Sequence, residues 1–219
     1  AAPGVLTPLN TLPKARYPQP PQQIQYFNTL LPKLASLPGV TDVGMVAPLP
    51  FSDNDQSTSF GVVGQPATAP GMQPSASHLT TDGNYFHTMR IPLLHGRTFN
   101  ERDREKSPPM IMVNETFAKT YLGPGNPLGQ RIKIGSSKTI REIVGVVGSS
   151  KHDSLAAPAG PEFYIPFPQA PATYLDLVLR PAAPAPDAIP PALPRAVPQR
   201  PRPPPSPVAP PPPHPPPRP

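Results

Sequence analysis

Cysteine and tryptophan are both absent from this 219-residue sequence. Without cysteine the chain cannot form disulfides, thiolate metal sites or cysteine nucleophiles, although the compartment stays open because periplasmic domains can also do without cysteine. Aromatic residues make up only 6% of the sequence, so we do not expect the stacking platforms on which proteins bind nucleic-acid bases. These absences exclude whole classes of site and favour none.

Long apolar runs are also missing. No stretch approaches the roughly 18 consecutive apolar residues of a membrane-spanning helix, and the first residues show no basic-then-apolar signal sequence. We therefore expect either a soluble protein or a domain that lies between membrane helices in a longer chain.

Proline is abundant and unevenly distributed, because 20 of the 43 prolines lie in residues 181–219. This segment contains a single acid, Asp187, four arginines and almost no large apolar residue after Val197. Too little surface can be buried there to offset the entropy of ordering the chain. We predict a folded unit over residues 4–180 and a disordered proline-rich tail. The tail could be a polyproline II ligand, a semi-rigid spacer or the product of a reading-frame error.

The net charge is +6, and the proline-rich tail contributes half of it. In the folded unit acidic and basic side chains are interspersed, as on an ordinary protein surface. A nucleic-acid-binding protein would instead gather its basic side chains on one face. We therefore expect no nucleic-acid partner.

Short segments with alternating apolar and polar residues dominate the folded unit. They predict strands at residues 4–12, 40–46, 60–63, 77–81, 110–113, 131–134, 140–147, 163–165 and 174–180. Asn114 is predicted to cap a two-turn helix that carries Phe117. Strands outnumber helices and mix with them irregularly, so the predicted class is α+β.

A longer helix is predicted to begin at Pro21, where the missing N–H of proline costs nothing. Its apolar face is formed by Ile24, Phe27, Leu31 and Leu34. Pro32 lies inside this face and should kink or shorten the helix. Together with the strands at residues 4–12 and 40–46, this helix gives a βαβ-type unit.

The stretch from Asp82 to Phe99 differs from the rest of the chain. Tyr85, Phe86 and Met89 give a single helical turn one apolar face, and Pro92 prevents this turn from continuing. A turn this short is not stable alone, so it must dock on a sheet.

Several groups of polar residues resemble fragments of functional sites. His78, Asp82, His87 and His95 lie within 18 residues of one another. They show neither the pairing nor the spacing of zinc ligands, so surface or edge histidines are the simpler interpretation. The mixed charges of residues 100–107 favour a solvated turn over an acid/base pair.

Three other segments also resemble functional motifs but lack residues that those motifs require. Residues 53–55 begin like a calcium loop, but Thr58 and Gly64 stand where an EF-hand needs glycine and glutamate. Residues 145–148 lack the third glycine of a dinucleotide fingerprint. Residues 151–154 combine a base, an acid and a hydroxyl without a nucleophile elbow. We predict no enzymatic activity and no catalytic, metal-binding or cofactor-binding residue.

Six motifs follow one another in a fixed order. They are LPGV at 37–40, APLP at 47–50, GNYFHTMRIPLLHGRTFNERD at 83–103, VNETFAKTYLGPGNPLGQRIKIG at 113–135, IVGVVG at 143–148 and YIPFPQ at 164–169. In this order they resemble the MacB-like periplasmic core domain of FtsX-like ABC transporter permeases, particularly the duplicated permeases of acidobacteria. The resemblance covers about residues 4–180. The tail departs from it, since family members continue with a helix and a strand.

The resemblance implies a position between the first two membrane helices of a permease, outside the inner membrane. It implies a membrane-proximal part (residues 4–47 and 172–180) and an inserted mixed α/β distal part (residues 51–168). It also implies that a cytoplasmic ATPase hydrolyses ATP while the outer domain relays the motion during transport or efflux. The partners would be the membrane helices, the ATPase and a periplasmic protein, and a homodimer is allowed.

We therefore predict a non-catalytic extracytoplasmic domain of an ABC transporter permease, localised at the inner (cell) membrane. The alternative is a secreted or wall-associated binding module with a proline-rich tail. In the permease interpretation the stretch 82–99 is the hinge of the inserted part. The expected core residues are Tyr85, Phe86, Leu94, Phe99, Phe117, Ile143 and Val146.

Overall fold

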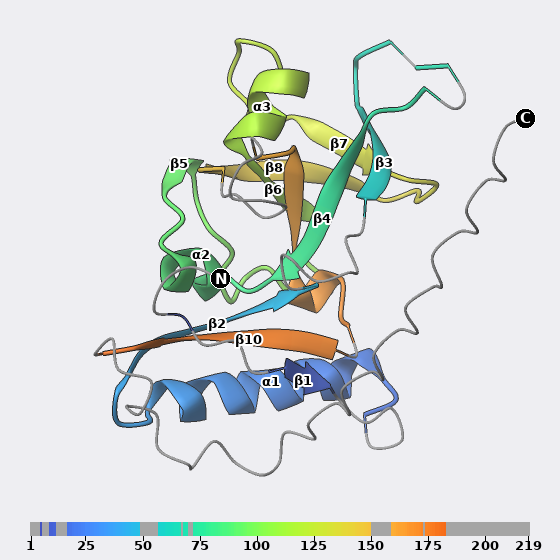
Figure 1. Ribbon diagram of the computed structural model, residues 1–219. Coiled ribbons are helices and arrows are strands. Elements are labelled where there is room, and N and C mark those ends of the chain that lie inside the picture. Colours follow the sequence, from blue (N-terminus) through green and yellow to red (C-terminus); the bar gives the residue numbers. More distant parts are fainter. Residues whose placement is uncertain are drawn as a thin grey trace, which may run out of the picture.

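A computed structural model describes residues 5, 9–11, 17–48, 57–66, 68–69, 72–149, 159–172 and 174–182. It confirms the mixed α and β class and has two stacked parts, a small sheet with one long helix and a larger body of strands (Figure 1). The helices are α1 (Pro20–Ala35), α2 (Asn84–Met89), α3 (Glu115–Tyr121) and the 3-10 turn η1 (Phe167–Gln169). The strands are β1 (Leu9–Thr11), β2 (Val40–Ala47), β3 (Ser57–Val62), β4 (Ser75–Thr81), β5 (Leu93–Gly96), β6 (Met110–Asn114), β7 (Arg131–Ile134), β8 (Ile140–Val147), β9 (Glu162–Pro166) and β10 (Tyr174–Pro181).

Six strands, β4, β3, β7, β8, β6 and β9, close into a ring that we call the barrel. Their pairing is antiparallel from β4 through β3 and β7 to β8, parallel between β8 and β6, and antiparallel between β6 and β9. A parallel pair of β9 with β4, from Ser77 opposite Glu162 to Thr81 opposite Pro166, completes the ring. Each of the six strands therefore has a ring neighbour on both sides.

The barrel core is formed by side chains from all six strands and from α3. Its buried members are Phe60, Ala76, Ile111, Val113, Phe117, Leu122, Ile132, Ile143, Val146, Phe163 and Ile165. Phe117 enters from α3 and lies with its ring centroid 4.7 Å from that of Phe60. The predicted cap of α3 is confirmed, because the side chain of Asn114 accepts the backbone N–H of Phe117 at 2.8 Å.

A β-bulge in β8 explains why this strand ends in a continuous apolar run. Its pairing with β6 skips one residue, since Ile111 lies opposite Ile143 but Met112 lies opposite Gly145. The extra residue shifts the alternation, so Ile143 and Val146 both face the barrel core. A side chain at Gly145 would meet the backbone oxygen of Arg97 at 2.3 Å, so only glycine fits there.

The second part, which we call the three-stranded layer, consists of β1, β10, β2 and α1. β10 lies between β1 and β2 and pairs antiparallel with both. One face packs on α1 through Phe27, Leu34, Val43, Met45, Ala47, Leu175, Leu177 and Leu179. The opposite face presents Val46 and Val178 toward the barrel, as expected when side chains alternate along a strand.

Helix α1 shows that one of the two predicted effects of Pro32, a shortened helix, is wrong. The helix continues for three residues beyond this proline to Ala35 and is not shortened. Proline in the last turn removes one hydrogen bond to the carbonyl of Asn28, which is exposed. Phe27 and Leu34 are fully covered on either side of it, so tertiary packing outweighs this loss.

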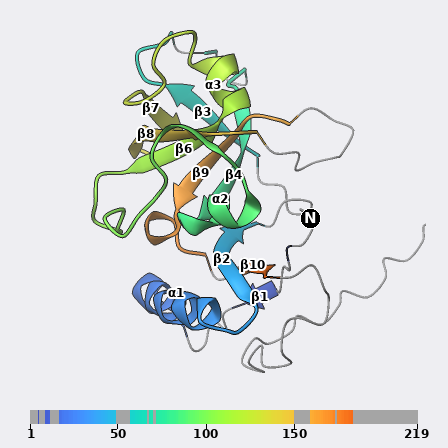
Figure 2. The same ribbon diagram turned by 90° about the vertical axis from the view of Figure 1, so that its left-hand side faces the viewer.

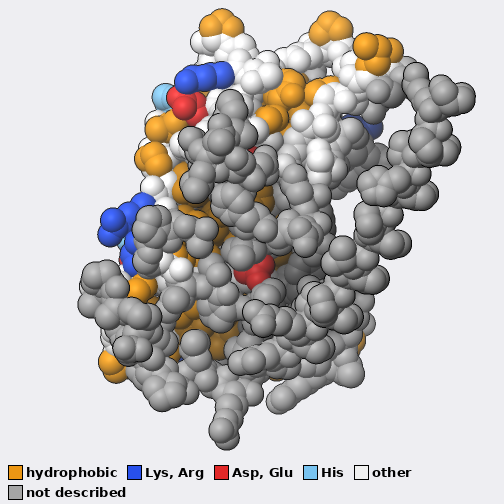
Figure 3. All heavy atoms as spheres, viewed as in Figure 1, with side chains coloured by type: hydrophobic (Ala, Val, Ile, Leu, Met, Phe, Trp, Pro, Cys, Tyr) orange, Lys and Arg blue, Asp and Glu red, His pale blue; other side chains and the backbone are white. Residues whose placement is uncertain are grey.

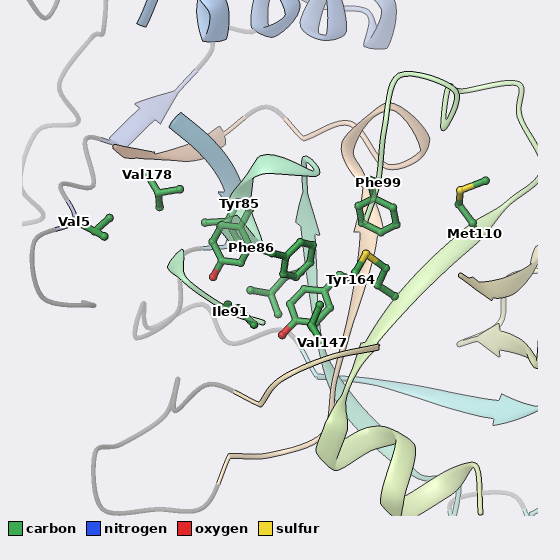
Figure 4. Close-up of a cluster of buried hydrophobic side chains, with 12 residues drawn as sticks. Val5, Tyr85, Phe86, Ile91, Phe99, Met110, Val147, Tyr164 and Val178 are labelled. Atoms are coloured by element: carbon green, nitrogen blue, oxygen red, sulfur yellow. The ribbon is translucent and has the colours of Figure 1, made fainter. Parts of the chain in front are cut away.

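The two parts meet along a seam. Their strands are joined at two residue pairs, Val46 with Thr81 and Ala47 with Thr80. Helix α2 lies at the same junction in both views (Figures 1 and 2). A cluster that we call the seam core fills the space: Val5, Val46, Leu79, Tyr85, Phe86, Ile91, Phe99, Met110, Met112, Val147, Tyr164 and Val178 (Figure 4).

Six of the seven expected core residues are buried, and one expectation is wrong. Tyr85, Phe86, Phe99, Phe117, Ile143 and Val146 are each exposed by 6% or less. Leu94 is 40% exposed because it lies on β5, all of whose residues are exposed and which pairs with β8. The predicted docking of the short turn at 84–89 on a sheet is confirmed by its packing on β2.

Candidate functional site

The chemically distinctive residues of the chain gather around α2 at the seam. The helix crosses β2 directly over Gly44, where a side chain would meet the backbone of Tyr85 at 2.7 Å. This close approach places the first turn of α2 against β2 and next to Asp82, which follows β4. The seam is therefore the candidate functional site.

Asp82 fastens α2 to the sheet. One carboxylate oxygen accepts the backbone N–H of Tyr85 and that of Met45, both at 3.0 Å. Burial raises the pKa of Asp82 to about 6, although the backbone donors act in the opposite direction. The carboxylate thus stabilises the backbone and is not free to bind a metal. An aspartate just before a short helix is a capping pattern that could have revealed this role in the sequence.

A second polar group is enclosed in the seam core. The hydroxyl of Tyr164 donates to a carboxylate oxygen of Glu162 at 2.5 Å, and both residues are buried. Burial raises the pKa of Tyr164 and of Tyr85, and the nearby charge of Glu162 raises both further. Both phenols stay protonated at neutral pH, so neither tyrosine can act as a base or nucleophile there.

Residues 100–107 are largely exposed, as expected for a solvated turn, but Asp103 is buried in a bidentate ion pair that closes the loop after β5. The guanidinium of Arg97 donates to the two oxygens of Asp103 at 2.7 and 2.9 Å. Asp103 is only 2% exposed and also accepts the backbone N–H of Asn100 at 2.9 Å. The hydrogen bonds that Arg97 donates to Asp103 raise the pKa of Arg97. The alternating charges of residues 100–107 gave no indication of the Arg97–Asp103 pair, because Arg97 precedes that segment.

An open groove of about 800 Å³ lies beside α2. Its walls come from β2, α2, the segment leading into β5, and the end of β10. The lining residues are Thr41, Asp42, Gly83, Asn84, Phe86, His87, Arg90, Ile91, Pro92, Leu93, Thr98, Arg180, Pro181 and Ala182. This is where the three-stranded layer and α2 share one surface.

The histidines that were considered as metal ligands lie in different surroundings. His87 pairs with Asp42 at 2.8 Å in the groove, whereas His78 contacts the hydroxyl of Thr58 at 3.0 Å and stacks on Phe163. His95 lies on β5. Among the described residues no group of three or more histidines, aspartates or glutamates could hold a metal ion.

Some of the sequence patterns fall outside the described residues. The calcium-like segment 53–55 and the base–acid–hydroxyl segment 151–154 belong to them, as does the tail beyond residue 182. Within the part of the chain that the structure describes, none of the helices is long and apolar enough to span a membrane.

The sequence and the fold both match known proteins. The sequence profile of the MacB-like periplasmic core domain matches residues 7–189. None of the curated proteins compared matches the sequence.

Two solved structures share the fold. One is the extracellular domain of the noncanonic ABC-type transporter YknZ from Gram-positive bacteria, with a TM-score of 0.52, 15% identity, and coverage of 82% of this chain and 84% of that one. The other is the periplasmic region of MacB from Actinobacillus actinomycetemcomitans, with a TM-score of 0.53, 16% identity, and coverage of 82% and 75%. At these identities the likeness concerns the fold alone. Because the profile spans most of the sequence, the chain belongs to the family of MacB-like periplasmic core domains.

Proposed function

We propose that this chain is the non-catalytic extracytoplasmic domain of an ABC transporter permease at the inner membrane. In this role it relays motion, driven by ATP hydrolysis in a cytoplasmic ATPase, to a substrate or partner outside the membrane. The observation that carries the proposal is the family match over residues 7–189. YknZ, whose extracellular domain has this fold, is an ABC-type transporter.

The arrangement of the strands supports an attachment through one layer. β1 and β10, the first and last strands, are neighbours in the three-stranded layer. Segments that precede β1 and follow β10 would therefore start from the same layer, which would face the membrane. In this proposal residues 4–47 and 172–180 form the membrane-proximal part, and residues 51–168 form the distal part that contains the barrel.

The seam supports a relay by relative movement of the two parts. Two residue pairs join β2 to β4, whereas β10 and β2 are joined along six. A short ladder resists bending less than a long one, because fewer hydrogen bonds must distort. Helix α2 and the stretch 82–99 would then act as the hinge, and Tyr85, Phe86 and Phe99 would anchor it in the seam core.

The position outside the membrane can be tested with a single cysteine, since the chain has none of its own. The side chain of Lys119 is 73% exposed, so Lys119→Cys should react with a membrane-impermeant maleimide on intact cells. The label should then appear in the membrane fraction. Labelling only after cell lysis would refute an extracytoplasmic position. Label in the culture medium or the cell wall would favour a secreted binding module.

The relay can be tested by tying α2 to β2. The side chains of Asp42 and His87 meet at 2.8 Å, so Asp42→Cys/His87→Cys places two thiols across the hinge. If the two parts must move, oxidation should strongly reduce ATP turnover by the purified permease–ATPase complex, and reduction should restore it. Each single-cysteine variant serves as the control. Unchanged ATP turnover in a fully cross-linked complex would contradict the relay.

A further inference from the structure

The charges in the groove beside α2 are not balanced. Among the described lining residues Asp42 is the one acid, and it contacts His87, whose imidazole carries a charge only when protonated. Arg90 and Arg180 also line the groove, and neither forms an ion pair with a carboxylate of the described residues. Asp42 lies directly opposite Arg180 in the β2–β10 pairing. The described lining residues therefore carry two arginines against one aspartate, which is an excess of positive charge.

Arg90 occupies a backbone position that ordinarily favours glycine. It ends α2 with φ 57° and ψ 36°, in the left-handed region. Among the described residues it is the one non-glycine with positive φ. Glycine would adopt this conformation without the steric cost that an arginine bears. The backbone conformation therefore gives no reason for an arginine here, and its side chain is exposed at the edge of the groove.

Arg180 reaches the same place from β10. Its guanidinium donates to the carbonyl of Thr88 at 2.9 and 2.6 Å, close to the C-terminal end of α2. These bonds fix the orientation of the side chain without neutralising its charge. A guanidinium that is already held in place loses less conformational entropy when it binds a ligand.

Apolar side chains complete the groove. Phe86 and Ile91 are buried in the seam core and form part of its lining, and Leu93 is 43% exposed at its margin. Figure 3 shows Lys and Arg side chains at the left margin at the height of α2, with hydrophobic side chains next to them. We propose that this groove binds a segment of a partner protein that carries both carboxylates and apolar side chains, with Arg90 and Arg180 pairing with its carboxylates.

Two other occupants fit the charges less well. The proline-rich tail continues from Ala182 at the groove, but its four arginines and single aspartate give it the same sign of charge. An anionic membrane surface attracts a protein by about 1 kcal/mol for each basic residue near it. Two arginines beside a carboxylate would bind such a surface weakly, and among the described lining residues Leu93 is the one large apolar side chain that is exposed enough to insert into it.

The test uses the complete chain and three fluorescein-labelled peptides of twelve residues. All three carry leucine at alternate positions, with aspartate, serine or lysine between. Fluorescence anisotropy should show binding of the aspartate peptide, weaker binding of the serine peptide and none of the lysine peptide. Arg90→Gly should weaken binding of the aspartate peptide by about tenfold or more, the loss typical of a charged residue central to binding. Arg90→Lys should retain most of it.

Two controls separate binding from folding. Arg90→Gly should melt at the same temperature as the original chain or higher, because glycine fits the left-handed position. Arg102→Gly removes an exposed arginine of the loop after Phe99 and should leave peptide binding unchanged. Equal binding by the original chain and Arg90→Gly would overturn the proposal, as would the absence of binding to the aspartate peptide. Binding to vesicles with 30% phosphatidylserine in preference to the peptide would also overturn it, in favour of a membrane surface.

This inference deepens the proposed function, because a relay needs a surface that faces its partner. The two can fail separately. If the chain binds the aspartate peptide through Arg90 but is not labelled outside the membrane, the proposed role of the groove is supported and the proposed permease function is refuted. If the chain is labelled outside the membrane but does not bind the peptide, the proposed permease function is supported and the proposed role of the groove is refuted.

Discussion

The barrel and the three-stranded layer deal with the edges of their sheets in different ways. The barrel closes on itself, so each of its strands is paired on both sides and its core is enclosed by its own residues. The three-stranded layer ends at β1, which has three residues, and α1 covers only one of its faces. Its other face is covered by α2 and the barrel. The difference indicates that the barrel is the stable body, whereas the layer depends on the seam.

The largest effect is expected in the barrel core. Phe117→Ala removes a fully buried ring that contacts Phe60, Tyr121 and Phe163. The free energy of unfolding should fall by about 3–5 kcal/mol, the usual cost of such a cavity. Urea denaturation measures it. Lys119→Ala on the same helix should change the stability by less than about 1 kcal/mol, and an equal loss for both variants would contradict the assignment of this core.

A smaller effect, dependent on pH, is expected at the seam. The pKa of Asp82 is about 6 in the folded chain against 3.8 ordinarily, so between these values the folded state holds a proton that the unfolded state has lost. The free energy of unfolding should therefore fall as the pH rises from about 4 to about 6. At about 1.4 kcal/mol for each pKa unit, Asp82 contributes about 2–3 kcal/mol to this fall.

Asp82→Asn should remove that contribution, because the amide oxygen can still accept the two backbone N–H groups without bearing a charge. Urea denaturation at pH 4, 5, 6 and 7 measures the difference between the two chains. The advantage of the asparagine variant should grow with pH up to about 6. A difference that stays constant across this range would mean that the carboxyl group is not desolvated.

Gly44→Ala tests the contact of α2 with β2 directly. The new methyl group would lie 2.7 Å from the Cα of Tyr85, so the helix must move, at a cost of about 1–3 kcal/mol. Gly61→Ala on β3 is the matched control, because nothing lies within 4 Å of its added methyl group. If the seam holds the layer to the barrel, the Gly44→Ala variant should unfold in two transitions. The helicity of α1 should be lost in the first, and the barrel should unfold in the second. One shared transition would contradict that dependence.

The smallest change in stability is expected for a substitution of Leu94, which was predicted from the sequence to be a core residue. Leu94→Ser changes a residue that is 40% exposed on β5, so the stability should change by no more than about 0.5 kcal/mol. Phe99→Ser, five residues later and 6% exposed, should cost several times as much by the same denaturation measurement.

Most of the described strands could be predicted from the sequence because alternation and short apolar runs are local properties, but β5 was not among them. Leu94 shows the limit of such local patterns, since an apolar residue three positions after the buried Ile91 gives no sign that β5 lies on the surface. Asp103 shows another limit, because its burial depends on Arg97 and on the path of the intervening loop. The pairing of β4 with β9 joins residues 77–81 to 162–166, and the alternation of either strand does not indicate its neighbour.

The candidate site could be predicted only in part. The stretch 82–99 is distinctive in the sequence, and Tyr85, Phe86 and Phe99 lie in the seam core as expected. The groove could not be predicted, because it needs Asp42 from β2 and Arg180 from β10 beside α2. The left-handed conformation of Arg90 is a property of the backbone, and the presence of an arginine in the sequence does not indicate it.

The central position of β10 has a consequence for the order in which the chain can fold. The last described strand lies between the first two, so β1 and β2 have no partner on that side until residues 174–181 have been synthesised and, if the domain is exported, have crossed the membrane. Until then Val43, Met45 and Ala47 lack the neighbouring row of leucines at 175, 177 and 179. Folding that waits for distant contacts is slow, and the waiting chain exposes apolar strand edges to aggregation and proteolysis. A chaperone that shields β2 during this interval would protect the step on which completion of the domain depends.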